Sequence, residues 1–254
     1  MRLSITHYTA TSAAGTGLSA LRQSLARRRS GLRRNDFETC DLDTWIGRVP
    51  YVEKTRLPTG CEALQSRNNQ LAWLGLQQDG MLDAVTALSQ RLDPHRIGVV
   101  MGTSTSSIGR TEDAYKQLEE SGRMRPEFRQ PGVHNLNSPG IFVAASTGLK
   151  GPAITISTAC SSSAKVFATA ARWIRNGIVD AALVGGVDSL CLSVLYGFNS
   201  LELVSSKPCR PFDQERNGIN IGEAAGYALL LREDLDPNGA LQLAGYGESS
   251  DAYH

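Results

Sequence analysis

The sequence has little that would mark a membrane, secreted or nucleic-acid-binding protein. No apolar run approaches the roughly 18 residues needed to cross a bilayer. The first residues lack the basic segment and long apolar core of a secretory signal. Lys and Arg number 26 against 25 Asp and Glu, so the net charge of +1 gives no reason to expect nucleic acid binding. We therefore expect a cytoplasmic protein that binds neither membranes nor nucleic acids.

Cysteine is also scarce, with five residues scattered along the chain and no Cys-x-x-Cys pair. That spacing fits neither a disulfide framework nor a structural zinc site. The loop at 103–107 lacks the Gly-x-Gly-x-x-Gly and Gly-Lys-Ser/Thr patterns of phosphate cradles. We therefore expect no bound metal, nucleotide or other cofactor.

What is present fits a globular α/β protein. Hydrophobic residues make up 41% and charged residues 20% of the 254-residue chain, which is ordinary for a chain that buries a core. Leu18, Leu21 and Leu25 recur at helical spacing before the stop at Ser30-Gly31, and apolar spacing over 69–88 predicts one or two more helices. The apolar run 96–102, closed by glycine, predicts a buried strand that turns into a helix.

The second half of the chain contains a strand-helix-strand pattern. The alternation over 152–157, the helical face over 161–176 and the apolar run 181–186 predict a right-handed parallel crossover. The segment 123–139 is rich in Pro, Asn and Gly and predicts irregular structure. Two later segments, 218–232 and 241–247, predict further strands of the same sheet.

Cys160 stands where this crossover passes from strand to helix, in the run Ile-Ser-Thr-Ala-Cys-Ser-Ser-Ser-Ala. A thiol at a helix amino terminus faces unpaired N–H groups and the positive end of the helix dipole, and both favour the thiolate. The same N–H groups can hold the oxyanion formed when a thioester is attacked. The small neighbours Ala159 and Ser161 leave room for a long acyl substrate. We therefore interpret Cys160 as a candidate nucleophile.

Two other interpretations of this segment stay open from the local pattern. In one, Thr158 and the serines only cap a helix, and Cys160 packs in the interior. In the other, Ser161, Ser162 or Ser163 is the nucleophile of a hydrolase. The second is weaker, because hydroxyls in the first turn of a helix tend to be used by the backbone.

Four ordered motifs resemble one known family. They are the active-site-like run 158–163, the Val-Gly-Gly-Val-Asp run at 184–188, the Arg-Pro-Phe-Asp run at 210–213 and the Gly-Glu-Ala-Ala-Gly run at 222–226. Together they resemble the β-ketoacyl-acyl carrier protein synthases, types I and II, of the thiolase-fold condensing enzymes. The resemblance implies an α/β thiolase-like fold in which helices sandwich a mixed sheet. Residues 1–254 would then form one unit, the first of two similar halves, with the carboxy-terminal half absent.

The resemblance also implies roles for individual residues. Cys160 would take the acyl group from acyl carrier protein as a thioester before decarboxylative condensation with the malonyl form of that carrier. Thr105, Ala159 and Ser161 would border the acyl substrate. Because acyl carrier proteins are acidic, a basic docking surface is expected. The candidates for it are Arg67, Lys207 and Arg210.

Further expectations follow from the same resemblance. The intact enzyme would be a homodimer acting in fatty acid or polyketide-type biosynthesis. The family's catalytic histidines are not matched by His7, His95, His134 or His254, so we expect this chain alone to be inactive in condensation. A non-catalytic partner subunit of the chain-length-factor kind and a degradative thiolase are the alternatives. In the signature segment, Asp213 and Arg216 are expected to pair and fix a turn.

Overall fold

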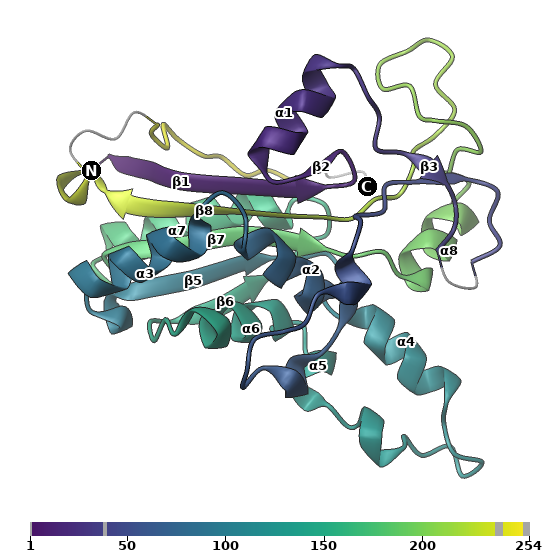
Figure 1. Cartoon of the computed structure of the whole chain (residues 1–254), viewed down its shortest axis with the longest axis horizontal. Coiled ribbons are helices and arrows are strands. Elements are labelled where there is room, and N and C mark those ends of the chain that lie inside the picture. Colours follow the sequence, from purple (N-terminus) through teal and green to yellow (C-terminus); the bar gives the residue numbers. More distant parts are fainter. Residues whose placement is uncertain (1, 38–39, 237–240, 251–254) are drawn as a thin grey trace.

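A single mixed β-sheet organises the computed structural model, which describes residues 2–37, 40–236 and 241–250 (Figure 1). Its six strands lie in the order β2-β1-β8-β7-β5-β6, and a separate two-stranded ribbon pairs β3 with β4. The strands are β1 Leu3–Ser12, β2 Gly15–Thr16, β3 Arg33–Arg34, β4 Trp45–Ile46, β5 Ile97–Gly102, β6 Ala153–Ile156, β7 Ala181–Asp188 and β8 Ala224–Arg232.

Eight α-helices connect and cover these strands in the described part of the chain. They are α1 Leu18–Ala26, α2 Arg67–Leu76, α3 Met81–Arg91, α4 Ile108–Lys116, α5 Pro131–His134, α6 Ser138–Thr147, α7 Ser162–Arg175 and α8 Leu192–Ser200. Short 3₁₀ turns occupy Val52–Lys54, Glu62–Leu64, Pro94–Arg96, Pro126–Phe128 and Glu233–Leu235. In Figure 1, α4 and the chain that follows it project away from the sheet at the lower right.

The sheet is parallel at one side and antiparallel at the other. Strand β5 runs parallel to both β6 and β7, and β8 runs antiparallel to both β7 and β1. The unit β6-α7-β7 therefore crosses over β5, which is the parallel crossover that the sequence pattern predicts. Parallel strands bring their carboxyl ends to one edge, so β5, β6 and β7 all end near the turn that carries Cys160.

Alternation along the central strands divides the core into two layers. Leu183, Tyr227 and Leu229 face a core packed under α2, α3 and α6. Val184 and Leu230 face the opposite core, formed with α7. Val99 and Val100 of β5 divide in the same way. Because successive strand residues point to opposite faces, both layers draw on β5, β7 and β8.

Helix α7 is amphipathic, which explains its position on the sheet. Val166, Ala170 and Ile174 recur every four residues and are buried against the sheet. Burying a side chain such as Val166 or Ile174 stabilises the fold by about 1.5–3 kcal/mol. Arg172 and Arg175 lie in the last turn, where their charge complements the carboxyl end of the helix dipole.

Most predicted elements form. Over 69–88, where the spacing predicts one or two helices, there are two: α2 ends at Leu76, and α3 starts after Gly80, whose φ of 71° is left-handed. The segment predicted to be irregular, 123–139, contains the short helix α5. Of the strand predicted at 241–247, only the first residues pair with the sheet: Gln242 forms a bridge with Ser4, and the Leu241 carbonyl and Leu243 N bond Ile5 N and the Leu3 carbonyl of β1. Further along, Tyr246 stacks on Arg172 and Arg175 of α7.

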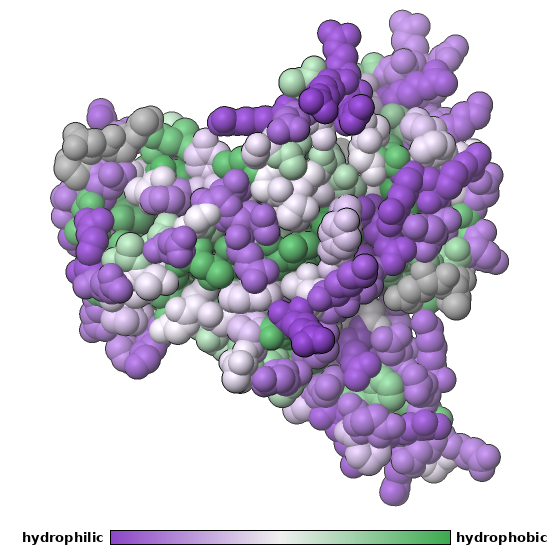
Figure 2. Space-filling model, viewed as in Figure 1, coloured by the Kyte–Doolittle hydropathy of each residue, from purple (hydrophilic) through white to green (hydrophobic). Residues whose placement is uncertain are grey.

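The surface is polar over most of the view in Figure 2, with hydrophilic side chains gathered over α1 and over the projecting segment after α4. Hydrophobic side chains appear between them, over the middle of the molecule. Across the described ranges, we find no helix with the length and apolar character that a bilayer crossing requires.

Candidate active site

Cys160 lies on an exposed turn between the end of β6 and the start of α7. The residue before it, Ala159, has a φ of 52°, in the left-handed region that a residue with a Cβ seldom adopts. Ser161 occupies the N-cap position, so the thiol stands just ahead of the first helical turn. The interpretation in which Cys160 packs in the interior is therefore wrong.

Hydroxyl groups fix the shape of this turn. The buried Ser162 Oγ accepts a hydrogen bond from Thr158 N at 2.9 Å and donates to the Ala159 carbonyl at 2.6 Å. Ser161 Oγ donates to the Thr158 carbonyl at 2.9 Å. Both serines thus hold the backbone around Ala159, as expected for hydroxyls in a first helical turn. That use of their hydroxyls disfavours Ser161 and Ser162 as nucleophiles.

Three glycines line up across the sheet beneath the start of α7. Gly102 of β5 pairs with Gly186 of β7, and Gly186 pairs with Gly226 of β8. A Cβ on Gly102 would lie 2.7 Å from the carbonyl carbon of Ser162, and one on Gly186 would lie 2.7 Å from Cβ of Ser163. This glycine row, Gly102-Gly186-Gly226, lets α7 rest directly on the strands and sets the height of the turn above the sheet.

Thr105 lies half-buried in the loop between β5 and α4. Cys191 is 2% exposed, and burial raises the pKa of its thiol to about 11. Cys191 is therefore held as a neutral thiol at physiological pH. Ala159 and Ser161 both lie exposed beside Cys160, so these two predicted acyl neighbours are accessible from outside.

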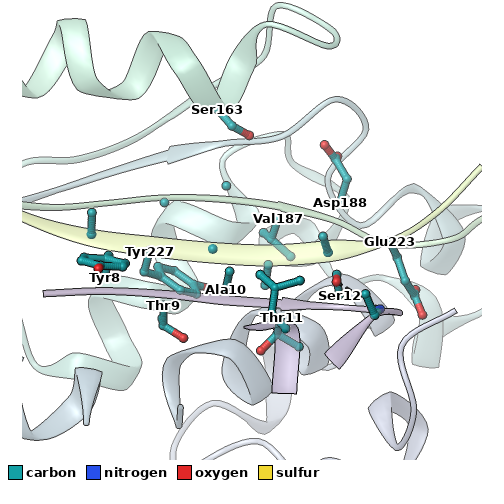
Figure 3. Close-up of a pocket in the computed structure, with 18 of the residues that line it drawn as sticks. Tyr8, Thr9, Ala10, Thr11, Ser12, Ser163, Val187, Asp188, Glu223 and Tyr227 are labelled. Carbon is teal, nitrogen blue, oxygen red and sulfur yellow. Dashed lines mark hydrogen bonds between the residues drawn. The ribbon is translucent and has the colours of Figure 1, made fainter. Parts of the chain in front are cut away.

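A hollow of about 870 Å³ opens on the α7 face of the sheet, and we name it the β1–β8 hollow (Figure 3). Small residues form its floor, namely Ala10, Gly186, Ala224 and Gly226, with Tyr8 and Phe167 among the larger ones at its sides. Tyr8 is 46% exposed, although it belongs to a central β-pairing. The hollow therefore presents apolar surface beside the helix that carries the site.

Glu223, from the glycine-rich signature, is the centre of a buried clamp. Its side chain is 0% exposed, and Arg67 binds it through Nη2–Oε1 at 2.6 Å and Nε–Oε2 at 2.8 Å. Its two oxygens also accept hydrogen bonds from Val49 N and Leu190 N, each at 2.9 Å. The clamp thus joins the start of β8 to α2 and to the segment that follows β7.

A second carboxylate extends this clamp outward. Arg67 Nη1 binds Glu53 Oε1 at 2.6 Å, and Arg48 binds the same oxygen. Partial burial alone would raise the pKa of Glu53, but the hydrogen bonds from Arg48 and Arg67 outweigh it and lower that pKa to about 2. The guanidinium of Arg67 is thereby occupied on both sides, and its side chain is only 14% exposed.

The other two basic candidates lie on the exposed segment 201–216. Lys207 is exposed, and its ammonium group forms no ion pair with any residue of the described ranges. Arg210 is half-exposed and binds Glu215 at 3.0 Å. The predicted pairing of Asp213 with Arg216 is wrong: Arg216 Nη1 donates to the Asp213 main-chain carbonyl, while the carboxylate accepts from Glu215 N.

The histidines lie far from the Cys160 turn in the sequence. His7 belongs to β1 and His95 is exposed, and His254 lies outside the described residues. Both ring nitrogens of His134 are engaged, with Thr111 Oγ1 at 2.8 Å and the Phe128 carbonyl at 2.6 Å. Over the described ranges, we also find no group of three or more His, Cys, Asp or Glu side chains that could hold a metal ion.

An exposed thiol thus stands on a left-handed turn, at the amino end of a helix and above strands that carry glycines, an arrangement that can serve covalent acyl chemistry. The family description "Beta-ketoacyl synthase, N-terminal domain" matches residues 62–235, more than half of the chain. The chain belongs to the β-ketoacyl synthase family. Its match includes Cys160, the glycine row and the Arg67–Glu223 pair, while Arg48, Val49 and Glu53 of the clamp lie before it.

Individual β-ketoacyl synthases and their relatives agree with this assignment. Nodulation protein E of Rhizobium meliloti (strain 1021) is 35% identical over 165 residues, which is 63% of this chain and 41% of that protein. The chloroplastic 3-oxoacyl-[acyl-carrier-protein] synthase I of Hordeum vulgare is 32% identical over 179 residues, which is 65% of this chain and 38% of that protein. The present chain therefore matches well under half the length of these curated relatives.

Solved β-ketoacyl synthases show the same fold. A ketosynthase from Xenorhabdus doucetiae, determined in complex with its chain length factor, superposes with a TM-score of 0.75 at 33% identity, over 91% of this chain and 58% of that one. The α/β thiolase-like fold predicted from the motifs, with a mixed sheet between helices, is thus confirmed.

Proposed function

We propose that this chain is the acyl-accepting part of a β-ketoacyl-acyl carrier protein synthase, with Cys160 as the nucleophile. The Cys160 thiolate would attack the thioester of an acyl carrier protein, and the carrier thiol would leave. The resulting acyl-enzyme would then be attacked by the carbanion formed when malonyl-carrier protein loses carbon dioxide. The product would be a β-ketoacyl carrier protein of fatty acid or polyketide-type biosynthesis.

The observation that carries this proposal is the exposed Cys160 on a left-handed turn at the start of α7, inside the matched family region. The amide groups at the start of the helix can stabilise both the thiolate and the oxyanion of the tetrahedral intermediate. A chain-length-factor-like subunit needs no such thiol. A nucleophilic serine needs a free hydroxyl, which disfavours Ser161 and Ser162 because both are hydrogen-bonded to the turn; Ser163 is left as the serine to test.

We propose that carrier protein docks on the exposed segment that holds Lys207 and Arg210. Lys207 is the stronger candidate, because its charge is unpaired within the described ranges, while Arg210 already binds Glu215. An acidic partner would gain attraction from such charges mainly in its rate of association. Arg67 was expected to join this surface, and its two carboxylate partners leave it the weakest of the three for that role.

We propose a homodimer that joins copies through β6, which pairs only with β5 among the described strands. Val99 N binds the Pro152 carbonyl and Thr103 N binds the Ile156 carbonyl. The alternation of a parallel ladder therefore turns the N–H groups of Ala153 and Thr155 toward the open edge. Ala153→Pro should weaken the dimer in light scattering and Ala153→Ser should not; equal masses for the two variants would contradict this interface.

We also propose that the β1–β8 hollow is a packing surface for the part of a condensing enzyme that lies beyond these residues. The curated relatives extend well beyond the matched region, and the apolar floor suits a helix laid beside α7. The isolated chain should then bind an apolar dye and associate, and a clean monomer that binds no dye would contradict the idea. A cytoplasmic location remains a prediction from the sequence.

Labelling of the thiols tests the central proposal. The protein is incubated with an acyl carrier protein thioester, digested, and the acylated residue is located by mass spectrometry. We expect the acyl group on Cys160 and none in Cys160→Ala. Cys191 is the internal control, because burial raises its thiol pKa to about 11. Acylation of any other residue at the wild-type rate in Cys160→Ala would exclude Cys160 as the nucleophile. We expect no condensation with malonyl-carrier protein by this chain alone.

A further inference from the structure

Asp188 binds the loop that follows β5 through three hydrogen bonds. Its Oδ1 accepts from Thr103 Oγ1 at 2.9 Å and from Ser104 N at 2.7 Å, and its Oδ2 accepts from Ser104 Oγ at 3.3 Å. Asp188 is the last residue of β7, and Figure 3 shows its carboxylate on the same side of the sheet as Ser163 of α7. One carboxylate thus ties the ends of two parallel strands together.

The loop that Asp188 holds is tightly shaped. The Thr103 hydroxyl, which donates to Asp188, also accepts a hydrogen bond from Ser106 N at 2.9 Å. Ser106 is buried and has a φ of 55°, a backbone state that persists only where surrounding contacts determine it. Thr105, the expected neighbour of the acyl group, lies between these two residues. The carboxylate of Asp188 therefore fixes the conformation around Thr105.

The same loop supports the turn of the nucleophile. Ser157 Oγ donates to the Ser104 main-chain carbonyl at 3.2 Å, and Ser157 stands three residues before Cys160. Ser104 consequently binds Asp188 through its N–H and hydroxyl and Ser157 through its carbonyl. A continuous path of hydrogen bonds joins the end of β7 to the strand exit that leads into the Cys160 turn.

Asp188 is itself positioned by strand β8 and by contacts near the Glu223 clamp. It pairs with Ala224 at the start of β8, and Leu190 N, two residues further on, binds the buried Glu223 at 2.9 Å. The position of the carboxylate is therefore set by the sheet and by the clamp, not by the loop that it binds. Asp188 therefore holds the 103–107 loop in place, and the loop does not hold Asp188.

We propose that Asp188 is a positioning residue for Cys160 and Thr105, acting through the 103–107 loop and Ser157. The proposal rests on the proposed function of Cys160. It adds the residue that fixes the position of the Cys160 thiol relative to Thr105, the expected neighbour of the acyl group. Asp188 touches neither the thiol nor a substrate in this role. Its effect is on where the turn lies above the glycine row.

The test compares carboxylates at the two ends of β7. Asp188→Ala removes the carboxylate that binds the 103–107 loop. Asp180→Ala removes a carboxylate that lies just before β7 and binds Arg96 at 2.9 Å and Arg232 at 3.1 Å. Both variants should lower the melting temperature. Only Asp188→Ala should slow alkylation of Cys160 by iodoacetamide, by about 10- to 100-fold, since a displacement of about 1 Å can cost that much in a positioned group. The pH dependence of the alkylation rate in Asp188→Ala should also differ from that of the wild type.

Two milder variants keep the test decisive if Asp188→Ala fails to fold. Asp188→Asn keeps one oxygen acceptor and should restore most of the Cys160 rate. Ser157→Ala removes only the hydrogen bond to Ser104 from an exposed position and should slow Cys160 by about 3- to 10-fold. Unchanged Cys160 rates and pH profiles in Ser157→Ala, and in Asp188→Ala where that variant folds, would overturn the proposal, as would equal slowing by Asp180→Ala.

These outcomes are separable from those for the proposed function. Alkylation by iodoacetamide measures the environment of the thiol without any carrier protein. If wild-type Cys160 is not acylated but its alkylation depends on Asp188, the function fails and the positioning role stands. If Cys160 is acylated equally fast in wild type and in folded Asp188→Ala, the function stands and the positioning role fails.

Discussion

Glu223 and Arg67 form a bidentate ion pair inside the protein, with both N–O distances below 3 Å and the carboxylate fully buried. The remaining acceptor capacity of the carboxylate is used by Val49 N and Leu190 N. A buried ion pair is stable only when its hydrogen bonds are satisfied in this way, because both charges have lost their water. The relative placement of three separate segments thus depends on one carboxylate.

We therefore predict that Glu223→Ala lowers the free energy of unfolding by about 3–5 kcal/mol, the usual cost of leaving one partner of a buried pair without the other. Denaturant titration followed by circular dichroism measures it. Glu215→Ala is the matched control, because the Arg210–Glu215 pair is exposed and worth about 1 kcal/mol or less. Equal losses in the two variants would show that Glu223 is no more than a surface partner.

The glycine row predicts a steric effect at the nucleophile helix. Gly102→Ala places a Cβ 2.7 Å from the Ser162 backbone, so the start of α7 must shift. We expect slower alkylation of Cys160 and a loss of about 1–3 kcal/mol of stability. Gly197→Ala in α8 is the control, since nothing lies within 4 Å of its added Cβ and alanine favours helix. Tolerance of Gly102→Ala with unchanged Cys160 reactivity would argue against close support of α7.

We expect substitution of Ser162 to destabilise the Cys160 turn and substitution of its neighbour Ser163 to have little effect on stability. Ser162→Ala removes an acceptor of Thr158 N and a donor to the Ala159 carbonyl, at a cost of about 1–3 kcal/mol. Ser163 is exposed and has no hydrogen-bond partner for its hydroxyl among the described residues, so Ser163→Ala should change little. Thermal melts and ester hydrolysis measure both. Loss of an esterase activity in Ser163→Ala alone would favour a hydrolase over a condensing enzyme.

Glu53 predicts a pH dependence of stability. Its pKa is lowered from 4.5 to about 2 in the folded protein, so its contribution is complete above pH 4.5 and is lost as pH falls toward 2. Glu53→Gln should melt at a lower temperature than wild type at pH 7, by an amount corresponding to about 1 kcal/mol or less for this partly exposed pair. The two melting temperatures should converge between pH 4.5 and pH 2. A difference that persists below pH 2 would contradict the assignment.

Local patterns predict the parallel half of the sheet well, because β5, β6-α7 and β7 carry clear apolar periodicity in short, closely spaced segments. The position of Cys160 follows from the same periodicity. Strand β1 is different: its sequence Leu-Ser-Ile-Thr-His-Tyr-Thr-Ala-Thr-Ser is largely polar, and it is a strand because β8 supplies its partner. Pairing with a strand more than 200 residues later is not visible in a local pattern.

The contacts within the site join residues that are far apart in the sequence, so the sequence alone does not show which residues meet. Glu223 and Arg67 are 156 residues apart, and Asp188 and Ser104 are 84 apart. The signature suggested instead a local pair of Asp213 and Arg216, whose side chains do not meet because Arg216 donates to a main-chain carbonyl. Spacing along the chain predicts neighbours only within one helix or turn, so charge partners across a sheet need the fold.

The glycine row also has a mechanical consequence. Across β5, β7 and β8, the line through Gly102, Gly186 and Gly226 carries no side chains on the face that α7 covers, so no cross-strand side-chain pairs stiffen the strands there on that face. The first turn of α7 is the brace for that line, in the place where side chains brace other parts of a sheet. Movement of that helix end and curvature of the strands beneath it should then occur together, as one hinge that runs across three strands.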